Sequence, residues 1–275
     1  MTLITCDIKA QFGSFHNPSS NVGGLLTYII PPKTTVQGIL GSILGLNFRE
    51  TVEVFKDFKY TVKPLSSLKT VNCTYNCHYG RRGGMANINQ ELLIKPNYRL
   101  YLHIPNIEPT EEVVNNLKQR FEHIRDEDYI SNILNKVMEK KESYYNLYMG
   151  KNEFPLSYQL KDTGGWKKQT IKDLEENRFF IDTALPRDAV KEYKIEVNSE
   201  KEPMDVFSMS STEKFRVDNI RKLPKTQDKN REFQEFEDVV LKQPKSKVLL
   251  KARLKNNLPD DYTLYRKDNE LLVCF

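Results

Sequence analysis

The order of strand-like and helical segments in the first 160 residues most constrains how this chain can fold. Alternating apolar residues indicate strands, and apolar residues spaced by three and four indicate helices. We predict, in chain order, a strand at 2–9, a short extended run at 25–30, a helix at 36–46, strands at 57–64 and 98–104, helices at 110–125 and 129–140, and a strand at 154–160. This order is that of a ferredoxin-like domain, which RNA-recognition modules share. The sequence therefore predicts an α+β fold with a ferredoxin-like (RRM-like) domain over residues 1–165.

The predicted helix at 36–46 follows a diproline, and Thr34 and Thr35 are its candidate N-caps. It contains three glycines, although each glycine in a helix interior costs about 1 kcal/mol relative to alanine. Their spacings of three and four residues place all of them on one face: Gly38, Gly41 and Gly45. Such a face allows a backbone or a phosphate to approach closely. Tight packing of the helix is the favoured explanation, ahead of direct RNA contact.

Residues 166–275 are predicted to form a smaller, mostly β C-terminal lobe. Its strand-like pieces lie at 178–183, 193–197, 248–253 and 271–275. The charged stretch 216–247 separates them and is predicted to be mobile. Trp166, at the start of this lobe, is suited to stacking on RNA, to anchoring a partner subunit or to packing inside the lobe.

Positive charge is concentrated in the first third of the chain. The net charge is only +5, but residues 1–100 hold 11 basic and 5 acidic side chains, so residues 101–275 hold 31 and 32. The segment 58–90 contains no carboxylate, and its basic side chains are Lys59, Lys63, Lys69, Arg81 and Arg82. A polyanion such as RNA should therefore be attracted to this segment.

An insertion at 66–95, between two predicted strands, combines the residue types that bind single-stranded nucleic acids. Its arms, 68–78 and 87–93, have the pattern of a long β-hairpin, with a glycine-rich tip at 79–85. Arginines suit phosphates, aromatic rings stack on bases, and short polar side chains contact base edges. The candidates for phosphate contact are Arg81 and Arg82, those for base stacking are Tyr75 and Tyr79, and those for base edges are Asn72, Asn76 and His78. A solvated loop would explain the glycines and the charge, but it explains the interleaved aromatic residues less well.

The cysteines and the hydropathy indicate a cytoplasmic protein without a metal. Four cysteines do not form a disulfide framework and fit a reducing compartment. Cys73, Cys77 and His78 are the one candidate metal cluster, but no second pair completes four ligands, so we predict ordinary thiols and no cofactor. There is neither a run of roughly 20 apolar residues nor a secretory signal, so we expect no membrane association. No Gly-x-x-x-x-Gly-Lys-Ser/Thr motif is present, which predicts no ATPase activity.

Three segments resemble motifs of the CRISPR-associated Cas-five family. The first is the most specific, because it combines a diproline, a threonine pair and a glycine-spaced helix. The segments are Tyr28-Ile29-Ile30-Pro31-Pro32-Lys33-Thr34-Thr35-Val36-Gln37-Gly38-Ile39-Leu40-Gly41, preceded by Phe12-Gly13-Ser14-Phe15-His16-Asn17-Pro18; Glu91-Leu92-Leu93 with Pro96-Asn97-Tyr98-Arg99-Leu100-Tyr101; and Tyr145-Asn146-Leu147-Tyr148-Met149-Gly150-Lys151-Asn152-Glu153-Phe154-Pro155. The resemblance covers roughly residues 1–160.

This resemblance implies a RAMP-superfamily fold whose hairpin is the family's thumb, in a type I surveillance (Cascade) complex, possibly of type I-B. The implied role is to hold and cap the 5′ handle of the crRNA for antiviral defence. The implied partners are the crRNA, a Cas-seven backbone subunit, a Cas-eight large subunit and, through the assembled complex, target DNA. The implied RNA-binding residues are Lys33, Thr34 and Thr35 at the helix start and Lys69, Asn72, Tyr75, Asn76, His78, Tyr79, Arg81 and Arg82 on the thumb. Without the family resemblance, Lys33 would be interpreted as a solvated lysine in a turn.

Catalysis is a separate question, because in type I-C the family's member cleaves precursor RNA. Metal-independent cleavage needs an acid and a base beside a 2′-hydroxyl. The candidates are His16, His78, His103 and His123, but none has a recognisable catalytic spacing, and His103 alternates with a predicted core face. We therefore expect no catalytic residue and no enzyme activity, with a pre-crRNA endoribonuclease as the alternative.

A different class of protein also fits the composition. If the resemblance were accidental, the chain would be an unrelated ferredoxin-like RNA-binding regulator. A surveillance-complex subunit should co-purify with partner subunits and a guide RNA of uniform 5′ sequence, whereas a regulator should bind RNA alone.

Overall fold

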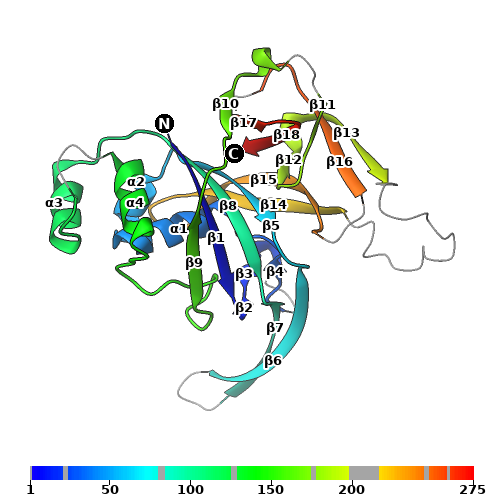
Figure 1. Ribbon diagram of the computed structural model, residues 1–275. Helices are drawn as coiled ribbons and strands as arrows, with labels where there is room; N and C mark the ends of the chain where they lie inside the picture. The colour runs from blue at the N-terminus through cyan, green and yellow to red at the C-terminus, as the bar shows by residue number, and fades with distance from the viewer. Residues whose placement is uncertain are drawn as a thin grey trace.

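A computed structural model describes residues 2–20, 24–79, 84–124, 129–174, 178–197, 217–244, 248–258 and 261–275. Over these residues the fold is mixed α/β and rich in strands, with four α-helices (Figure 1). The longest of these helices has 12 residues, so none in the described ranges could cross a bilayer. The predicted combination of helices and strands is therefore confirmed.

The first sheet has four strands, in the order β5-β8-β1-β9, with antiparallel neighbours throughout. Its strands are β1 (Thr2–Ala10), β5 (Lys59–Pro64), β8 (Asn97–Ile104) and β9 (Leu156–Lys161). Two helices connect β1 to β5, and two connect β8 to β9. They are α1 (Lys33–Leu44), α2 (Phe48–Val54), α3 (Glu111–Arg120) and α4 (Ile130–Glu139). Figure 1 shows the four helices together on one side of this sheet.

The main core lies between this sheet and the helices. In α4 the buried apolar residues recur at spacings of three and four, which produces one apolar stripe: Ile130, Ile133, Leu134, Val137 and Met138. In β8 every second residue enters the core, as predicted: Tyr98, Leu100, Leu102 and Ile104. Thr110 is the N-cap of α3, and its side chain accepts a hydrogen bond from the Val113 amide at 3.5 Å.

Helix α1 differs from its prediction at both ends. It begins at Lys33, after Pro32, so Thr34 and Thr35 lie in the first turn and are not N-caps. It ends at Leu44, and Gly45 caps it in the left-handed conformation with φ 73°. The predicted strand at 25–30 is reduced to β4 (Thr27–Tyr28), which pairs with β3 (Phe15–His16).

Helix α2 was not predicted, although its capping box is visible in the sequence. The Asn47 side chain accepts from the Glu50 amide, and the Glu50 carboxylate accepts from the Asn47 amide. A Cβ at Gly41 of α1 would overlap the side chain of Thr51 in α2, so these helices pack closely at that glycine. Gly38 meets nothing within 4 Å. The packing explanation therefore holds at Gly41, and the three glycines do not act together.

The described part of 166–275 consists of strands and short 3-10 turns, without an α-helix. One sheet has the order β10-β17-β18-β11-β16-β13 and another the order β12-β15-β14. In chain order the strands are β10 (Lys167–Gln169), β11 (Arg178–Phe180), β12 (Leu185–Pro186), β13 (Val190–Val197), β14 (Val217–Gln227), β15 (Phe233–Lys242), β16 (Val248–Leu254), β17 (Thr263–Lys267) and β18 (Glu270–Cys274). The mostly β character is as predicted, and the boundary at residue 165 stays a prediction.

The prediction that the charged stretch 216–247 is mobile is wrong over most of its length, because β14 and β15 pair there as a long hairpin. Four apolar residues of this hairpin enter the main core: Ile220, Leu223, Val239 and Leu241. The register shifts between Ile220 and Leu223, where Lys222 has φ 53°. This irregularity breaks the alternation that would have indicated a strand.

Trp166 is half-buried and packs against neighbouring side chains. Its ring lies 5.9 Å from that of Tyr101 in an edge-on arrangement, beside a small cluster of Leu3, Tyr265, Leu272 and Cys274. This contact joins the start of the C-terminal part to β8. Among its three predicted roles, packing is the one with a contact in this structure.

Candidate nucleic-acid interface

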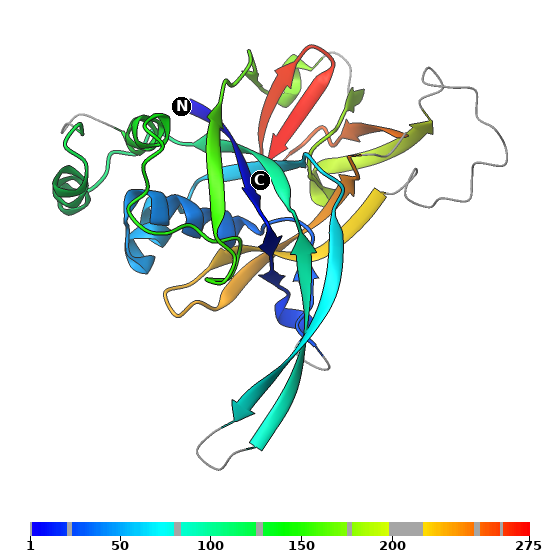
Figure 2. The ribbon, with the colours of Figure 1, turned by 60° about the horizontal axis from the view of Figure 1, so that its bottom comes forward.

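The predicted hairpin is present as β6 (Lys69–Tyr79) and β7 (Gly84–Ile94). The two strands pair without a break from Lys69 and Ile94 at the base to Tyr79 and Gly84 near the tip. Figure 1 and Figure 2 show it projecting away from the rest of the molecule. Arg81 and Arg82 lie outside the described residues, as do the side chains of His78 and Tyr79.

The register gives the hairpin two unlike faces, because directly opposed residues share a face and successive residues alternate. The polar face is rich in amides and consists of Asn72, Thr74, Asn76, Asn87, Asn89 and Glu91. The apolar face consists of Val71, Cys73, Tyr75, Ile88, Gln90 and Leu92. The predicted residues Asn72 and Asn76 therefore lie together, whereas Tyr75 lies on the opposite face.

Both faces of the hairpin have accessible side chains. Asn72 and Asn76 are exposed, and the Thr74 hydroxyl bonds the Asn89 side chain at 2.7 Å across the strands. On the other face, Val71 is 41% exposed and Tyr75 38% exposed. A solvated hairpin does not need an apolar face, so contacts on both sides are expected.

The three motifs identified in the sequence meet at the foot of the hairpin. The Ser14 amide donates to the Met149 carbonyl at 3.0 Å, and the Thr27 amide donates to the Glu91 carboxylate at 3.1 Å. Gly150 has φ 90°, and a Cβ there would overlap the Ser14 carbonyl, so this position needs glycine. β2 (Phe12–Gly13) completes the foot by pairing with β7. These contacts anchor the hairpin to the body.

Lys33 lies far from the hairpin. The diproline before it is held on the first sheet, because the Tyr60 hydroxyl donates to the Pro31 carbonyl at 2.8 Å and the Tyr98 hydroxyl to the Ile29 carbonyl at 2.7 Å. Lys33 is therefore placed near the start of β5, and the hairpin begins after the other end of that strand, about 17 Å along it. The predicted RNA-binding residues thus divide into two separate places.

Lys33 is buried and is not a solvated turn lysine. Only 6% of its surface is exposed, and its amine lies 5.5 Å from the centre of the Phe58 ring. Thr34 is also buried, at 7% exposed, and Thr35 is half-buried. An RNA phosphate could therefore reach Lys33 only by entering the cleft that contains its amine.

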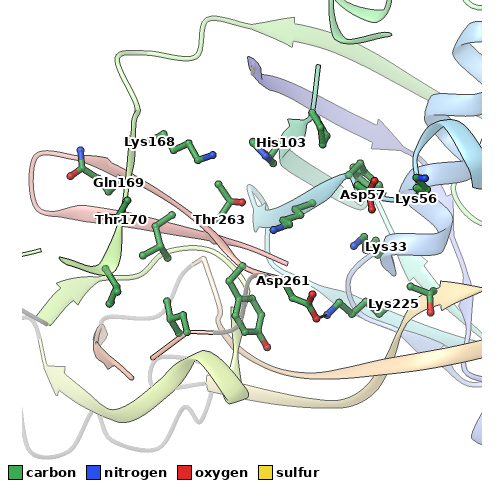
Figure 3. Close-up of a pocket in the computed structure, with 18 of the residues that line it drawn as sticks. Lys33, Lys56, Asp57, His103, Lys168, Gln169, Thr170, Lys225, Asp261 and Thr263 are labelled. Atoms are coloured by element: carbon green, nitrogen blue, oxygen red, sulfur yellow. Dashed lines mark hydrogen bonds and ion pairs between the residues drawn. The ribbon is translucent and has the colours of Figure 1, made fainter. Parts of the chain in front are cut away.

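That cleft has a volume of about 620 Å³ and lies between the start of α1, the ends of β5 and β8, and strands β10, β14 and β17 (Figure 3). Its charged lining has more bases than acids: Lys33, Lys56, Lys59, Lys168 and Lys225 against Asp57, Glu235 and Asp261. This cleft could not be predicted from the sequence, since its lysines come from segments far apart in the chain.

Burial and mutual repulsion shape the charges in the cleft. The pKa of Lys33 is lowered to about 8, mainly by burial and also by the nearby Lys225 and Lys59, while Asp261 and Glu235 act in the opposite direction. Burial, with Lys168 and Lys59, lowers the pKa of His103 to about 4, so this histidine is neutral at pH 7. His103 Nδ1 lies 2.7 Å from the Tyr265 hydroxyl, in agreement with its predicted structural role.

The remaining candidates do not form a site in the described residues. Cys73 is exposed, and no cluster of three or more metal-ligating side chains occurs in that part of the chain. The side chains of Cys77 and His78, which complete the candidate metal cluster, lie outside the described residues. His16 is exposed on β3 and is distant from His103 in the sequence.

The geometry defines a strand-rich α/β protein with an exposed two-faced hairpin, and comparison with known proteins adds its family. The model of the family described as CRISPR-associated protein (Cas_Cas5) matches residues 3–207. The chain therefore belongs to the CRISPR-associated Cas-five family. This excludes the alternative that the resemblance was accidental. No curated protein matches the chain.

Similar solved structures also come from CRISPR systems. A CRISPR protein from Archaeoglobus fulgidus is 10% identical, with 100% of this chain and 99% of that one covered and a TM-score of 0.49. A chain of the type III-B Cmr-beta complex bound to cognate target RNA and AMPPnP is 11% identical, with 97% and 98% covered and a TM-score of 0.48. A chain of a CRISPR RNA-guided surveillance complex is 12% identical, with 92% and 91% covered and a TM-score of 0.40. All three TM-scores lie below 0.5, so the family assignment rests on the family model.

Proposed function

We propose that this chain is a non-catalytic subunit of a type I CRISPR surveillance (Cascade) complex that binds and caps the 5′ handle of the crRNA. The observation that supports this most is the exposed, amide-rich face of the β6–β7 hairpin. Asparagine side chains both donate and accept hydrogen bonds, so they suit base edges and sugar hydroxyls of a single strand. The family assignment gives the context in which that strand is crRNA.

The fold supports a ferredoxin-like RAMP domain with a thumb. The main elements follow the ferredoxin-like order strand, helix, strand, strand, helix, strand, as β1, α1, β5, β8, α4 and β9. The sheet order β5-β8-β1-β9 has the first and third of these strands in the centre. The hairpin is inserted between β5 and β8, where the family resemblance puts its thumb.

The two faces of the hairpin suit two different partners. RNA would contact Asn72 and Asn76, with Lys69 at the base and, between the two strands in sequence, Arg81 and Arg82 supplying positive charge for phosphates. The apolar face with Val71 and Tyr75 suits a protein surface, and in a surveillance complex the neighbours are the Cas-seven backbone and Cas-eight large subunits.

The experiment is a binding and cleavage assay of the purified chain with 5′-handle RNA in EDTA. The Asn72→Ala/Asn76→Ala double variant should weaken binding about tenfold, since about two hydrogen bonds are lost. Asn132→Ala, on an exposed position of α4, is the matched control and should bind as the wild type. Equal binding by the double variant would exclude this face, and cleavage at one position would support the endoribonuclease alternative.

A further inference from the structure

A surface of stacked arginines and tyrosines lies where α1 ends and α2 begins, at the opposite end of α1 from Lys33. We propose that it binds a single-stranded nucleic acid. Its residues are Phe48, Arg120, Tyr144, Tyr145 and Arg231, and we call this surface the helix corner. Figure 1 shows the four helices apart from the projecting β6–β7 hairpin. The inference does not rest on the proposed function, because no hairpin residue takes part.

Two exposed tyrosines are held against the end of α1. The Tyr144 amide donates to the Ile43 carbonyl and the Tyr145 amide to the Ser42 carbonyl, each at 3.1 Å. A Cβ at Gly45 would lie 2.6 Å from the Tyr144 ring, so this ring lies directly on the glycine backbone. The residues are nevertheless 50% and 49% exposed. Their positions are fixed before a ligand binds, which lowers the entropy cost of stacking a base on them.

Arg120, the last residue of α3, lies over the Tyr144 ring, with its Cζ 4.9 Å from the ring centre. It is half-buried, and its Nη1 has no hydrogen-bond partner. Among the described residues, no carboxylate lies within ion-pair distance of its guanidinium. A guanidinium stacked on a ring keeps its N–H edge for an anion, and that edge matches the oxygens of a phosphate.

A second stack of the same kind lies on the other side of Gly45. The Arg231 Cζ is 4.8 Å from the centre of the Phe48 ring at the start of α2. Arg231 belongs to the turn between β14 and β15, which Asp228 holds by accepting from two amides at 2.8 and 2.9 Å (Figure 2). In the described part of the chain, this guanidinium also has no carboxylate partner. The Cα atoms of Gly45 and Phe48 are at most about 11 Å apart, so both arginines serve one surface.

The residue types alone fit two classes of partner, because arginine and aromatic residues are also enriched in protein interfaces. The charges favour nucleic acid. The segments 45–50, 118–122, 139–145 and 228–232 hold seven basic and six acidic side chains. Three of these acids have their oxygens engaged in hydrogen bonds within the protein: Glu50, Glu139 and Asp228. Arginines with open N–H edges, interleaved with aromatic rings, are the arrangement of single-strand binding surfaces.

The test uses the full chain and two labelled probes without a handle sequence, oligo(U) RNA and oligo(dT) DNA of about 20 nucleotides. Fluorescence anisotropy over a salt series gives the affinity and its salt dependence. We expect Arg120→Gln/Arg231→Gln to lower the affinity about tenfold and the salt slope by about 1.4, since two phosphate contacts are lost. Lys191→Gln/Lys194→Gln removes the same charge from exposed positions on β13 and should bind as the wild type.

Tyr145→Ala tests stacking separately from charge. We expect an affinity loss of about fivefold or more with an unchanged salt slope, because the ring is lost and the phosphate contacts remain. Tyr145→Phe keeps the ring and should bind as the wild type. Tyr145 is exposed, so its variants also keep the test decisive if the double arginine variant does not give the wild-type circular dichroism spectrum.

Tighter binding of one probe identifies the strand as RNA or DNA. The proposal is overturned if neither probe binds, or if either Tyr145→Ala or a folded double arginine variant binds both probes as the wild type. Loss of co-purifying partner subunits in the arginine variant, with unchanged probe binding, would make the corner a protein interface and would also overturn it. Loss of handle binding in Asn72→Ala/Asn76→Ala, with probe binding retained, separates this surface from the proposed function.

Discussion

The hydroxyl of Tyr60 donates a hydrogen bond to the carbonyl oxygen of Pro31 across 2.8 Å inside the core. Tyr60 is fully buried on β5, and Pro31 lies two residues before Lys33. Together with the second proline, this bond sets where α1 begins and therefore where the Lys33 amine enters the cleft. The diproline motif is thus explained by packing on the sheet.

Tyr60→Phe should destabilise the protein by about 1–3 kcal/mol, because the Pro31 carbonyl would remain buried without its donor. Urea unfolding followed by circular dichroism measures the loss. Tyr145→Phe, at a tyrosine that is 49% exposed, should leave the stability unchanged. An equal loss in both variants would contradict this role for Tyr60.

Two glycines of α1 should respond to alanine in opposite directions. Gly38→Ala should stabilise by about 0.5–1 kcal/mol, since the new methyl meets nothing and the helix gains propensity. Gly41→Ala should destabilise by about 1–3 kcal/mol, because Thr51 of α2 occupies that space. Thermal unfolding of the pair measures both effects. Destabilisation by Gly38→Ala would indicate a contact that this fold does not contain.

Gly150→Ala should be more damaging than either, because the position combines φ 90° with overlap of the Ser14 carbonyl. We expect a loss of about 2–4 kcal/mol and disturbed pairing at the foot of the hairpin. Hydrogen exchange of the Ser14 and Met149 amides reports that local change. Wild-type protection of both amides in the variant would show that the motif contact is unimportant.

The pKa of Lys33 predicts a pH-dependent stability difference. In the folded protein it is about 8, below the ordinary 10.5, so the unfolded chain binds more protons between these values and stability rises with pH there. Below pH 8 the full penalty applies, on the order of 3 kcal/mol. Lys33→Met should therefore be more stable than the wild type at pH 7.

The advantage of Lys33→Met should shrink as the pH rises from 8 to 10.5. Urea unfolding of both proteins at four pH values gives the difference between their free energies of unfolding. In this difference the titration of the groups that both proteins share cancels. A difference that stays constant over this range would mean that Lys33 titrates normally.

Sequence patterns gave the elements whose side chains follow one period without interruption. The helix at 129–140 and the strand at 98–104 were predicted because local spacing alone indicates them, and α4 and β8 lie at these positions. The β14–β15 hairpin was missed because charged residues and the irregularity at Lys222 hide its alternation.

The site divides in the same way. The hairpin was predictable, since both arms and the tip are contiguous in sequence, and its two faces follow once the register is known. The cleft was not, because Lys33, Lys168 and Lys225 are brought together only by the packing of distant strands. Local patterns contain no information on that packing.

The central claim is that this chain holds the 5′ end of crRNA inside a surveillance complex. The most direct measurement is to purify the tagged chain under mild salt from cells that express its CRISPR system, and to sequence the 5′ ends of the RNA that comes with it. We predict partner subunits in stoichiometric amounts and one uniform, repeat-derived 5′ sequence. Recovery of the chain alone, or with RNAs of mixed 5′ ends, would contradict the claim.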